Sequence, residues 1–217
     1  MLKVEHITAG YGKKHVLTDV SFDVEKGDTV LLSGGNGSGK STVLKTIYGL
    51  LKPWVSVPEG KIFFDGKEIT ALPVSAMIRY GIMYMPQKKN VFDDFTVEEN
   101  LLTSAGIYQK LDAKERMKKV FELLPQLEEL RKRSPFHLSG GERQLLAFGA
   151  TIIHSPKLML LDEPFAGVDA ENSAILVDCL KLLHEAGVVF VIVEHRRKVL
   201  KAFDCEEIYL QLGETKR

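Results

Sequence analysis

The sequence predicts an α/β fold, in which a largely parallel sheet is covered by helices on both faces. The runs 158–161 and 188–193 are apolar without interruption, which is typical of strands buried on both faces. A glycine-rich stretch at 34–39 separates a short apolar run from a run with helical spacing. From about residue 88 to residue 137 the spacing is helical, which predicts a helical block between two halves of the sheet.

The individual elements follow from short runs bounded by turn residues. Strands are expected at 2–7, 29–33, 61–66, 81–87, 158–164 and 188–195. Helices are expected at 42–51, 96–108 and 112–130, the last of them with Asp112 as its N-cap. Because no internal repeat or Pro/Ser-rich linker interrupts this order, we expect a single domain over residues 1–217.

Composition excludes some classes of partner. The chain has 29 Lys+Arg and 29 Asp+Glu, so zero net charge gives no reason to expect a nucleic-acid partner. The first residues lack the apolar segment of a signal peptide, and no apolar run approaches the ~20 residues that span a bilayer. We therefore expect a cytoplasmic protein that reaches a membrane only through a partner.

The two cysteines, Cys179 and Cys205, have no ligand-like spacing. They fall in a predicted helix and at the edge of a predicted strand. We therefore expect two buried thiols in a reducing compartment.

The glycine-rich stretch has the spacing of a phosphate-binding loop, Gly-x4-Gly-Lys-Ser, between a strand and a helix. Glycines let backbone N–H groups surround the phosphates, Lys40 reaches the β and γ phosphates, and the Ser41 hydroxyl can bind Mg²⁺. The alternative is an ordinary glycine-rich turn, which a full match in this context disfavours. The predicted triphosphate-binding residues are Gly34, Gly35, Asn36, Gly37, Ser38, Gly39, Lys40, Ser41 and Thr42.

Two adjacent acids end the strand expected at 158–164. Side chains alternate along a strand, so Asp162 and Glu163 need not have the same role. Asp162 can hold Mg²⁺, and Glu163 can polarise an attacking water. Exposed acids are also common at strand ends, but together with the loop at 34–42 these residues favour hydrolysis of a γ-phosphate.

A second anion-binding helix start occurs at Ser139, Gly140, Gly141 and Glu142. Ser-x-x-Glu is a capping box, which needs no ligand. Glycine, however, costs up to ~1 kcal/mol relative to alanine inside a helix. Two glycines therefore predict a close approach to this backbone, and we expect capping and phosphate binding to compete for the Ser139 hydroxyl.

Together, "GGNGSGKST", "LSGGERQ" and "LMLLDEP" resemble the signature of the ABC ATPase family over nearly the whole chain. The resemblance implies a P-loop NTPase fold of the ABC type, with an antiparallel β subdomain and a helical subdomain inserted at about 88–137. It also implies two ATP molecules sandwiched between head-to-tail subunits. Ser139, Gly140 and Gly141 would then contact ATP held by another subunit.

The remaining family motifs supply further candidates. Tyr11 matches the aromatic residue that stacks on adenine, and Asp169 matches an acid that acts across the subunit interface. Gln87 matches a glutamine that contacts Mg²⁺ and the water, and His195 a histidine that contacts the γ-phosphate. By resemblance, ATP and Mg²⁺ are the cofactors, the catalytic residues are Glu163, His195 and Gln87, and the metal ligands are Ser41, Gln87 and Asp162.

A single such domain resembles the separate ATPase subunit of a transporter. This implies transmembrane permease subunits as partners, a homodimer or heterodimer of ATPase subunits, and a position on the inner face of the cell membrane. The stretches "FFDGKEITALP" and "VFDDFTVEENLLTSA" resemble those of branched-chain amino-acid importers and of related polar amino-acid or urea importers. Two features depart from that pattern: Gln87 stands where one branch often has Glu, and the segment at Trp54–Pro58 is longer than usual. The alternative is a soluble ABC ATPase such as those of iron–sulfur cluster assembly.

Overall fold

Two sheets form the framework of the computed structural model, which describes residues 1–217 apart from 55, 57, 89, 108, 202 and 217. The larger sheet consists of β3 (Thr29–Ser33), β6 (Ile82–Met85), β7 (Leu158–Asp162), β8 (Val189–Val193), β9 (Cys205–Gln211) and β10 (Glu214–Lys216). The smaller sheet consists of β1 (Leu2–Tyr11), β2 (Lys14–Val24), β4 (Lys61–Phe64) and β5 (Lys67–Glu68).

The larger sheet is parallel except at one edge. Its strand order is β10-β9-β3-β8-β7-β6, and only β10 pairs antiparallel to its neighbour. The smaller sheet, with the order β2-β1-β4-β5, is antiparallel throughout. The chain thus has the α/β architecture and the separate antiparallel β unit that the sequence and its resemblance predicted.

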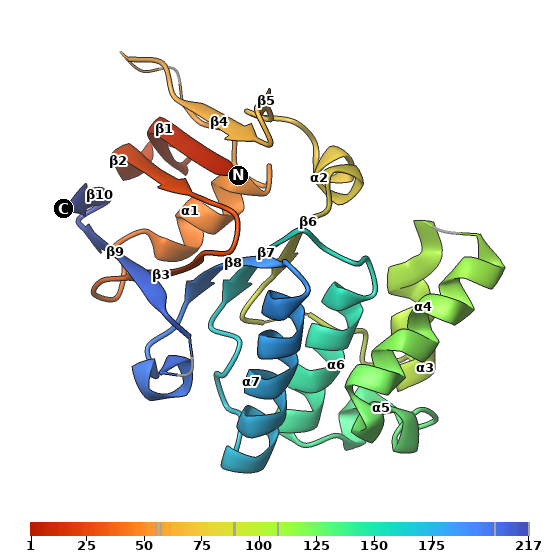
Figure 1. The fold of residues 1–217 in the computed structure, drawn as a ribbon. Coiled ribbons are helices and arrows are strands. Elements are labelled where there is room, and N and C mark those ends of the chain that lie inside the picture. The colour runs from red at the N-terminus through yellow and green to blue at the C-terminus, as the bar shows by residue number, and fades with distance from the viewer. Residues whose placement is uncertain (55, 57, 89, 108, 202, 217) are drawn as a thin grey trace.

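Helices cover the larger sheet on both sides (Figure 1). They are α1 (Lys40–Ile47), α2 (Val74–Tyr80), α3 (Val97–Ser104), α4 (Lys110–Leu123), α5 (Pro125–Glu129), α6 (Gly140–Ile152) and α7 (Ala170–Glu185). Short 3₁₀ turns are η1 (Ala105–Ile107), η2 (Pro135–His137) and η3 (Arg197–Leu200). In Figure 1, α6 and α7 lie side by side below the sheet, α3, α4 and α5 lie beyond α6, and α1 lies on the opposite side, toward β1 and β2.

The central strands separate two hydrophobic cores. All residues of β3, β7 and β8 are buried, as their uninterrupted apolar runs predicted. Alternation along β7 sends Leu158 and Leu160 into the core shared with α1 and the smaller sheet, and Met159 and Leu161 into the core shared with α6 and α7. Because these strands are packed on both faces, their positions are fixed. The candidate site described below lies where β3, β7 and β8 end.

Two local predictions were wrong in the helical part of the chain. The helix α4 begins at Lys110 with Gln109 as its N-cap, so Asp112 lies within the first turn instead of capping it. The predicted run 112–130 is also interrupted at Leu124, because Pro125 disfavours helical backbone in the residue before it. Pro125 instead starts α5, where its missing N–H has no cost.

The cysteines are only partly as predicted. Cys179 in α7 is buried, whereas Cys205 at the start of β9 is half-buried. Burial raises the pKa of Cys179 to about 12, and burial together with Asp204 raises the pKa of Cys205 to about 11. Both thiols therefore stay protonated at neutral pH.

None of the helices in the described part of the chain combines the length and apolar character needed to cross a bilayer.

Candidate functional site

The loop between β3 and α1 has a backbone that only glycine can adopt at two positions. Gly34 and Gly39 have φ values of 142° and 103°, in the left-handed region. A Cβ atom on Gly34 would lie 2.2 Å from the carbonyl oxygen of Leu210, and one on Gly39 would lie 2.6 Å from Cδ2 of Leu17. These two glycines therefore let the loop pack closely against its own chain.

Two other glycines of the same loop face open space. A Cβ atom on Gly35 or Gly37 would meet nothing within 4 Å. Lys40 turns back over this part of the loop, and its Nζ donates to the carbonyl oxygens of Gly34 and Gly35, both at 2.9 Å. Burial lowers the pKa of Lys40. The loop is thus a concave set of backbone groups around a buried ammonium group, which suits a phosphate chain.

The carboxylate of Asp162, at the end of β7, is held by two hydroxyl groups. Ser41 Oγ donates to Asp162 Oδ1 at 2.8 Å, and Tyr84 Oη donates to Oδ2 at 3.1 Å. Burial, followed by the charge of Asp162, raises the pKa of Tyr84, so its hydroxyl stays a donor. The sequence analysis did not identify Tyr84, which lies in the buried strand β6 and carries no motif.

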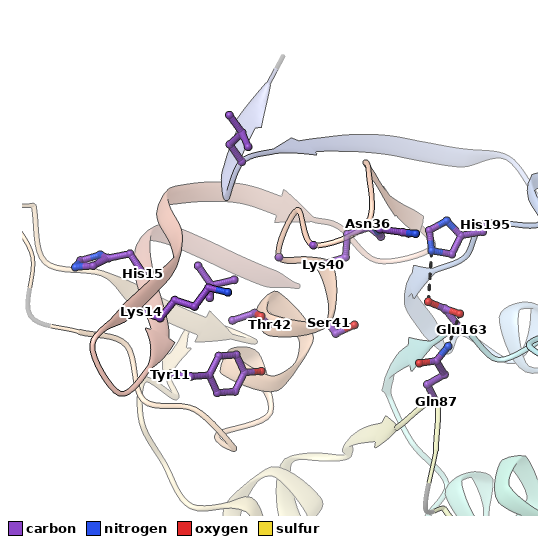
Figure 2. A pocket seen from close by; sticks show the side chains of 14 residues that line it. Tyr11, Lys14, His15, Asn36, Lys40, Ser41, Thr42, Gln87, Glu163 and His195 are labelled. Atoms are coloured by element: carbon purple, nitrogen blue, oxygen red, sulfur yellow. Dashed lines mark hydrogen bonds and ion pairs between the residues drawn. The ribbon is translucent and has the colours of Figure 1, made fainter.

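Glu163 lies between two polar side chains at the mouth of the site. Gln87 Nε2 donates to Glu163 Oε2 at 2.5 Å, and His195 Nε2 lies 3.4 Å from Glu163 Oε1 (Figure 2). The backbone of Glu163 has a φ of 52°, and its N–H donates to the carbonyl oxygen of Val193 at 2.8 Å. Such strain in a non-glycine residue is typical of functional sites. The structure therefore brings the three predicted catalytic residues together.

These groups line one cavity of about 800 Å³ (Figure 2). The predicted site residues that line it are Tyr11, Asn36, Gly37, Gly39, Lys40, Ser41, Thr42, Gln87, Glu163 and His195. Its wall also includes four residues that carry no motif and were not predicted, namely Lys14, His15, Val16 and Leu212. Gly34, Gly35, Ser38 and Asp162 are not in the lining, although Asp162 reaches it through Ser41.

Tyr11 lies at the end of the cavity away from Glu163, as Figure 2 shows. Its side chain is 46% exposed, which leaves ring surface free for a flat apolar group. Lys45 Nζ lies 5.9 Å from the ring centroid and 3.5 Å from the hydroxyl oxygen. Tyr11 and Lys40 thus line the same cavity, with the aromatic ring at the end away from Glu163.

The residues predicted to act across a subunit interface lie outside this cavity. Ser139, Gly140, Gly141 and Asp169 are absent from its lining. Ser139 caps α6 and Asp169 caps α7, and a Cβ atom on Gly141 would lie 2.6 Å from Asp169 Oδ2. The close approach that the sequence analysis expected at Gly141 is therefore made by the chain itself, from the start of α7.

The Ser139 hydroxyl takes part in the capping box that the sequence predicted. Ser139 Oγ accepts from the backbone N–H of Glu142 at 3.2 Å, and Glu142 Oε2 accepts from the N–H of Ser139 at 2.7 Å. The capping box therefore uses the hydroxyl only as an acceptor. Its hydrogen remains available as a donor, so capping and donation to an anion are compatible.

The chemistry of the donor set suits Mg²⁺. Ser41 Oγ and the Asp162 carboxylate are oxygen donors beside the phosphate loop, and Mg²⁺ bound with a nucleotide typically takes one or two such ligands plus phosphate oxygens. Among the described residues, no three His, Cys, Asp or Glu side chains form a metal cluster. When bound, the ion would neutralise charge on the phosphates. Gln87, the third predicted ligand, is occupied by Glu163 in this structure.

Known proteins are similar to this chain in sequence. The ABC transporter family model matches residues 17–166. LivF of Archaeoglobus fulgidus, a probable branched-chain amino acid transport ATP-binding protein, is 39% identical over 195 residues, which cover 89% of this chain and 81% of LivF. BraG of Pseudomonas aeruginosa, a high-affinity branched-chain amino acid transport ATP-binding protein, is 38% identical over 205 residues (94% and 86%). LptB of Haemophilus influenzae, a lipopolysaccharide export system ATP-binding protein, is 33% identical over 213 residues (97% and 86%).

Solved structures of ATP-binding cassettes have the same fold as this chain. A nucleotide-free ATP-binding cassette from an ABC transporter has a TM-score of 0.87 at 30% identity, covering 100% of this chain and 90% of that one. A dimeric post-hydrolysis state of an ATP-binding cassette bound to ADP and Pi has a TM-score of 0.86 at 26% identity (100% and 97%). The phosphate loop, the acids at the end of β7 and these similarities lead to one conclusion: the chain belongs to the ABC transporter family, as an ATP-binding and ATP-hydrolysing subunit.

Proposed function

We propose that this chain powers amino-acid import, with branched-chain amino acids as the first solutes to test. The names of the relatives at 39% and 38% identity support this choice. The observation that carries the ATPase part of the proposal is the placement of Glu163 between Gln87 and His195 at the mouth of the cavity. The ATPase subunit would lie on the inner face of the cell membrane and act through separate permease subunits.

In the proposed reaction, Glu163 polarises a water molecule that attacks the γ-phosphorus, the bond to the β-phosphate oxygen breaks, and ADP and inorganic phosphate leave. Lys40 neutralises the phosphates, and His195 contacts the γ-phosphate. Gln87, once released from Glu163, would contact the water, and Gln87, Ser41 and Asp162 would hold Mg²⁺, which would supply charge neutralisation at the phosphates. Catalysis then rests on positioning and charge neutralisation.

ATP binding would also close a dimer, of two identical or two related ATPase subunits. Ser139, Gly140, Gly141 and Asp169 lie outside the cavity of their own chain, which supports a role at the ATP of the opposite subunit. The free hydrogen of the Ser139 hydroxyl and the N-terminus of α6 would face that γ-phosphate. Hydrolysis removes the bridging charge, and the dimer opens.

The permease would dock beside Gln87, on the loop from residue 87 to about residue 95. Position 89 of this loop lies outside the described residues. Phe92 and Phe95 are 56% and 38% exposed, with ring centroids 5.4 Å apart. Asn100 holds this pair, because it accepts from the N–H of Phe92 and donates to the carbonyl oxygens of both phenylalanines. A fixed, exposed aromatic pair suits an apolar helix of a membrane partner.

The experiment is to express the tagged chain in its own cells, with native Phe92 and Phe95 or with both changed to Ser. Membranes are solubilised, co-purifying proteins are identified, and uptake of labelled leucine is measured. Co-purification of a multi-span permease and loss of leucine uptake in the double variant would support the proposal. Soluble iron–sulfur assembly proteins as the only partners would contradict it.

A second candidate function is export of a lipid-linked polysaccharide. The 33% identity to LptB over 97% of this chain favours keeping it. The same purification separates the two candidates. Recovery of lipopolysaccharide-export membrane proteins together with unchanged leucine uptake would replace import by export.

A further inference from the structure

A short loop joins two of the groups that the proposed reaction needs. It runs from Glu163 at the end of β7 to Asp169 at the start of α7. One end thus carries the acid beside the water, and the other carries the acid that caps α7 and lies against Gly141. Glu163 and Asp169 could therefore move independently unless contacts from outside the loop hold both ends of it.

A buried carboxylate fastens one side of this loop. Glu194 follows β8 and is 5% exposed. Its Oε1 accepts from the N–H groups of His195 and Arg196, both at 2.8 Å, and its Oε2 accepts from the N–H of Phe165 at 3.3 Å. A buried charge is tolerated only when its hydrogen bonds are made, as they are here by backbone donors of two different segments.

A guanidinium group fastens the other side. Arg196 Nη1 donates to the carbonyl oxygen of Phe165 at 3.0 Å and to that of Val168 at 2.9 Å. The side chains of Phe165 and Val168 are themselves buried in the core below the sheet. Arg196 therefore closes the loop near both of its ends, immediately after His195 in the chain.

We propose that Glu194 and Arg196 are positioning residues that hold the loop 163–169 and His195 as one unit. Glu163, His195 and Asp169 then keep a fixed geometry relative to one another. Loss of the γ-phosphate at Glu163 and His195 would therefore also shift Asp169 at the start of α7 and its contact with Gly141. The inference rests on the proposed function, because it assumes that Glu163 and His195 act on ATP. Neither Glu194 nor Arg196 needs to touch the nucleotide.

The test uses Arg196→Met, with Arg79→Met as a matched control. Arg79 is exposed in the last turn of α2, before β6, and does not line the cavity. The kcat of Arg196→Met should fall by about tenfold to a hundredfold, since a misplacement of about 1 Å can cost about a hundredfold in rate. The Kd for ATP and the Tm should stay close to those of the native chain, and Arg79→Met should match the native chain throughout.

A second variant tests whether the two residues act together. Glu194→Gln keeps the size of the side chain but replaces one carboxylate oxygen by an amide N–H₂ group, which cannot accept a hydrogen bond. That group would face either the backbone N–H of Phe165 or those of His195 and Arg196. Its kcat should fall as well, and the double variant should lose no more than the worse single variant, because residues of one unit are not additive.

Three results would overturn the inference: native kcat in Arg196→Met, a parallel loss of kcat, ATP affinity and Tm, or losses that multiply in the double variant. Failure of the proposed reaction is distinguishable, because the Glu163→Gln variant would then hydrolyse ATP like the native chain. A native chain that hydrolyses ATP, together with an unchanged kcat in Arg196→Met, would contradict only this inference.

Discussion

Lys40 is the residue on which nucleotide affinity should depend most. Its Nζ is held by the carbonyl oxygens of Gly34 and Gly35, where it would exchange these partners for phosphate oxygens. Lys40→Ala should therefore weaken ATP binding by about a hundredfold, the scale of a charge-assisted pair of contacts. Titration with a fluorescent ATP analogue measures the affinity of the native chain and of the variant. Lys181→Ala, on α7 and outside the lining of the cavity, is the control. Unchanged affinity in Lys40→Ala would contradict the role.

Tyr84 should matter for Mg²⁺ and much less for the nucleotide alone. Its hydroxyl holds Asp162 Oδ2 while Ser41 holds Oδ1, so Tyr84→Phe frees one oxygen of the predicted metal ligand. We expect the Mg²⁺ concentration for half-maximal binding of MgATP to rise by about threefold to tenfold, the effect of one hydrogen bond to a charged group.

The measurement is a Mg²⁺ titration of analogue binding, with Tyr48→Phe as the control because its ring packs against Tyr84. Equal Mg²⁺ dependence in Tyr84→Phe and Tyr48→Phe would show that the Tyr84 hydroxyl has no such role.

At the scale of elements, the start of α6 should be needed for closure of the dimer. A Cβ atom on Gly140 would lie 3.1 Å from the carbonyl oxygen of Gly167, so a larger side chain must displace the loop before α7. Gly140→Asp also adds negative charge where a phosphate would approach. We expect hydrolysis to fall by at least about tenfold while the affinity of the monomer for ATP is kept.

Paired ATPase and binding measurements check this, with Gly106→Asp as the control, since a Cβ atom there meets open space. If Gly140→Asp lowered monomer affinity as far as Lys40→Ala does, the role of this helix at the opposite subunit would be wrong.

Buried central strands were the most predictable elements. β7 and β8 are apolar on both faces because both faces are covered, and short uninterrupted apolar runs bounded by turn residues are typical of such strands. The strand β2 was not predicted, since its pattern is broken by polar residues that face solvent. The N-cap of α4 was missed because Gln109, which makes no side-chain cap hydrogen bond, precedes the better cap Asp112. Local sequence therefore predicted buried segments better than exposed ends.

At the scale of the whole molecule, the spacing of motifs predicted which side chains meet. Gln87, Glu163 and His195 follow three neighbouring parallel strands, so their side chains gather at one edge of the sheet. The partners of these groups were not predictable. Tyr84 and Arg196 act through contacts between distant segments, and Gly141 has a packing reason that the sequence could not separate from a ligand-binding one.

The most direct test of the account is the Glu163→Gln variant of the purified chain, with phosphate release, ATP binding and molecular mass measured together. The native chain should hydrolyse MgATP. The variant keeps the phosphate loop but loses the group that polarises the water, so its turnover should fall by at least about a hundredfold with ATP affinity unchanged. It should also accumulate the ATP-bound dimer of two copies, or the mixed dimer when the related subunit is added. Native-like hydrolysis in Glu163→Gln would contradict the account.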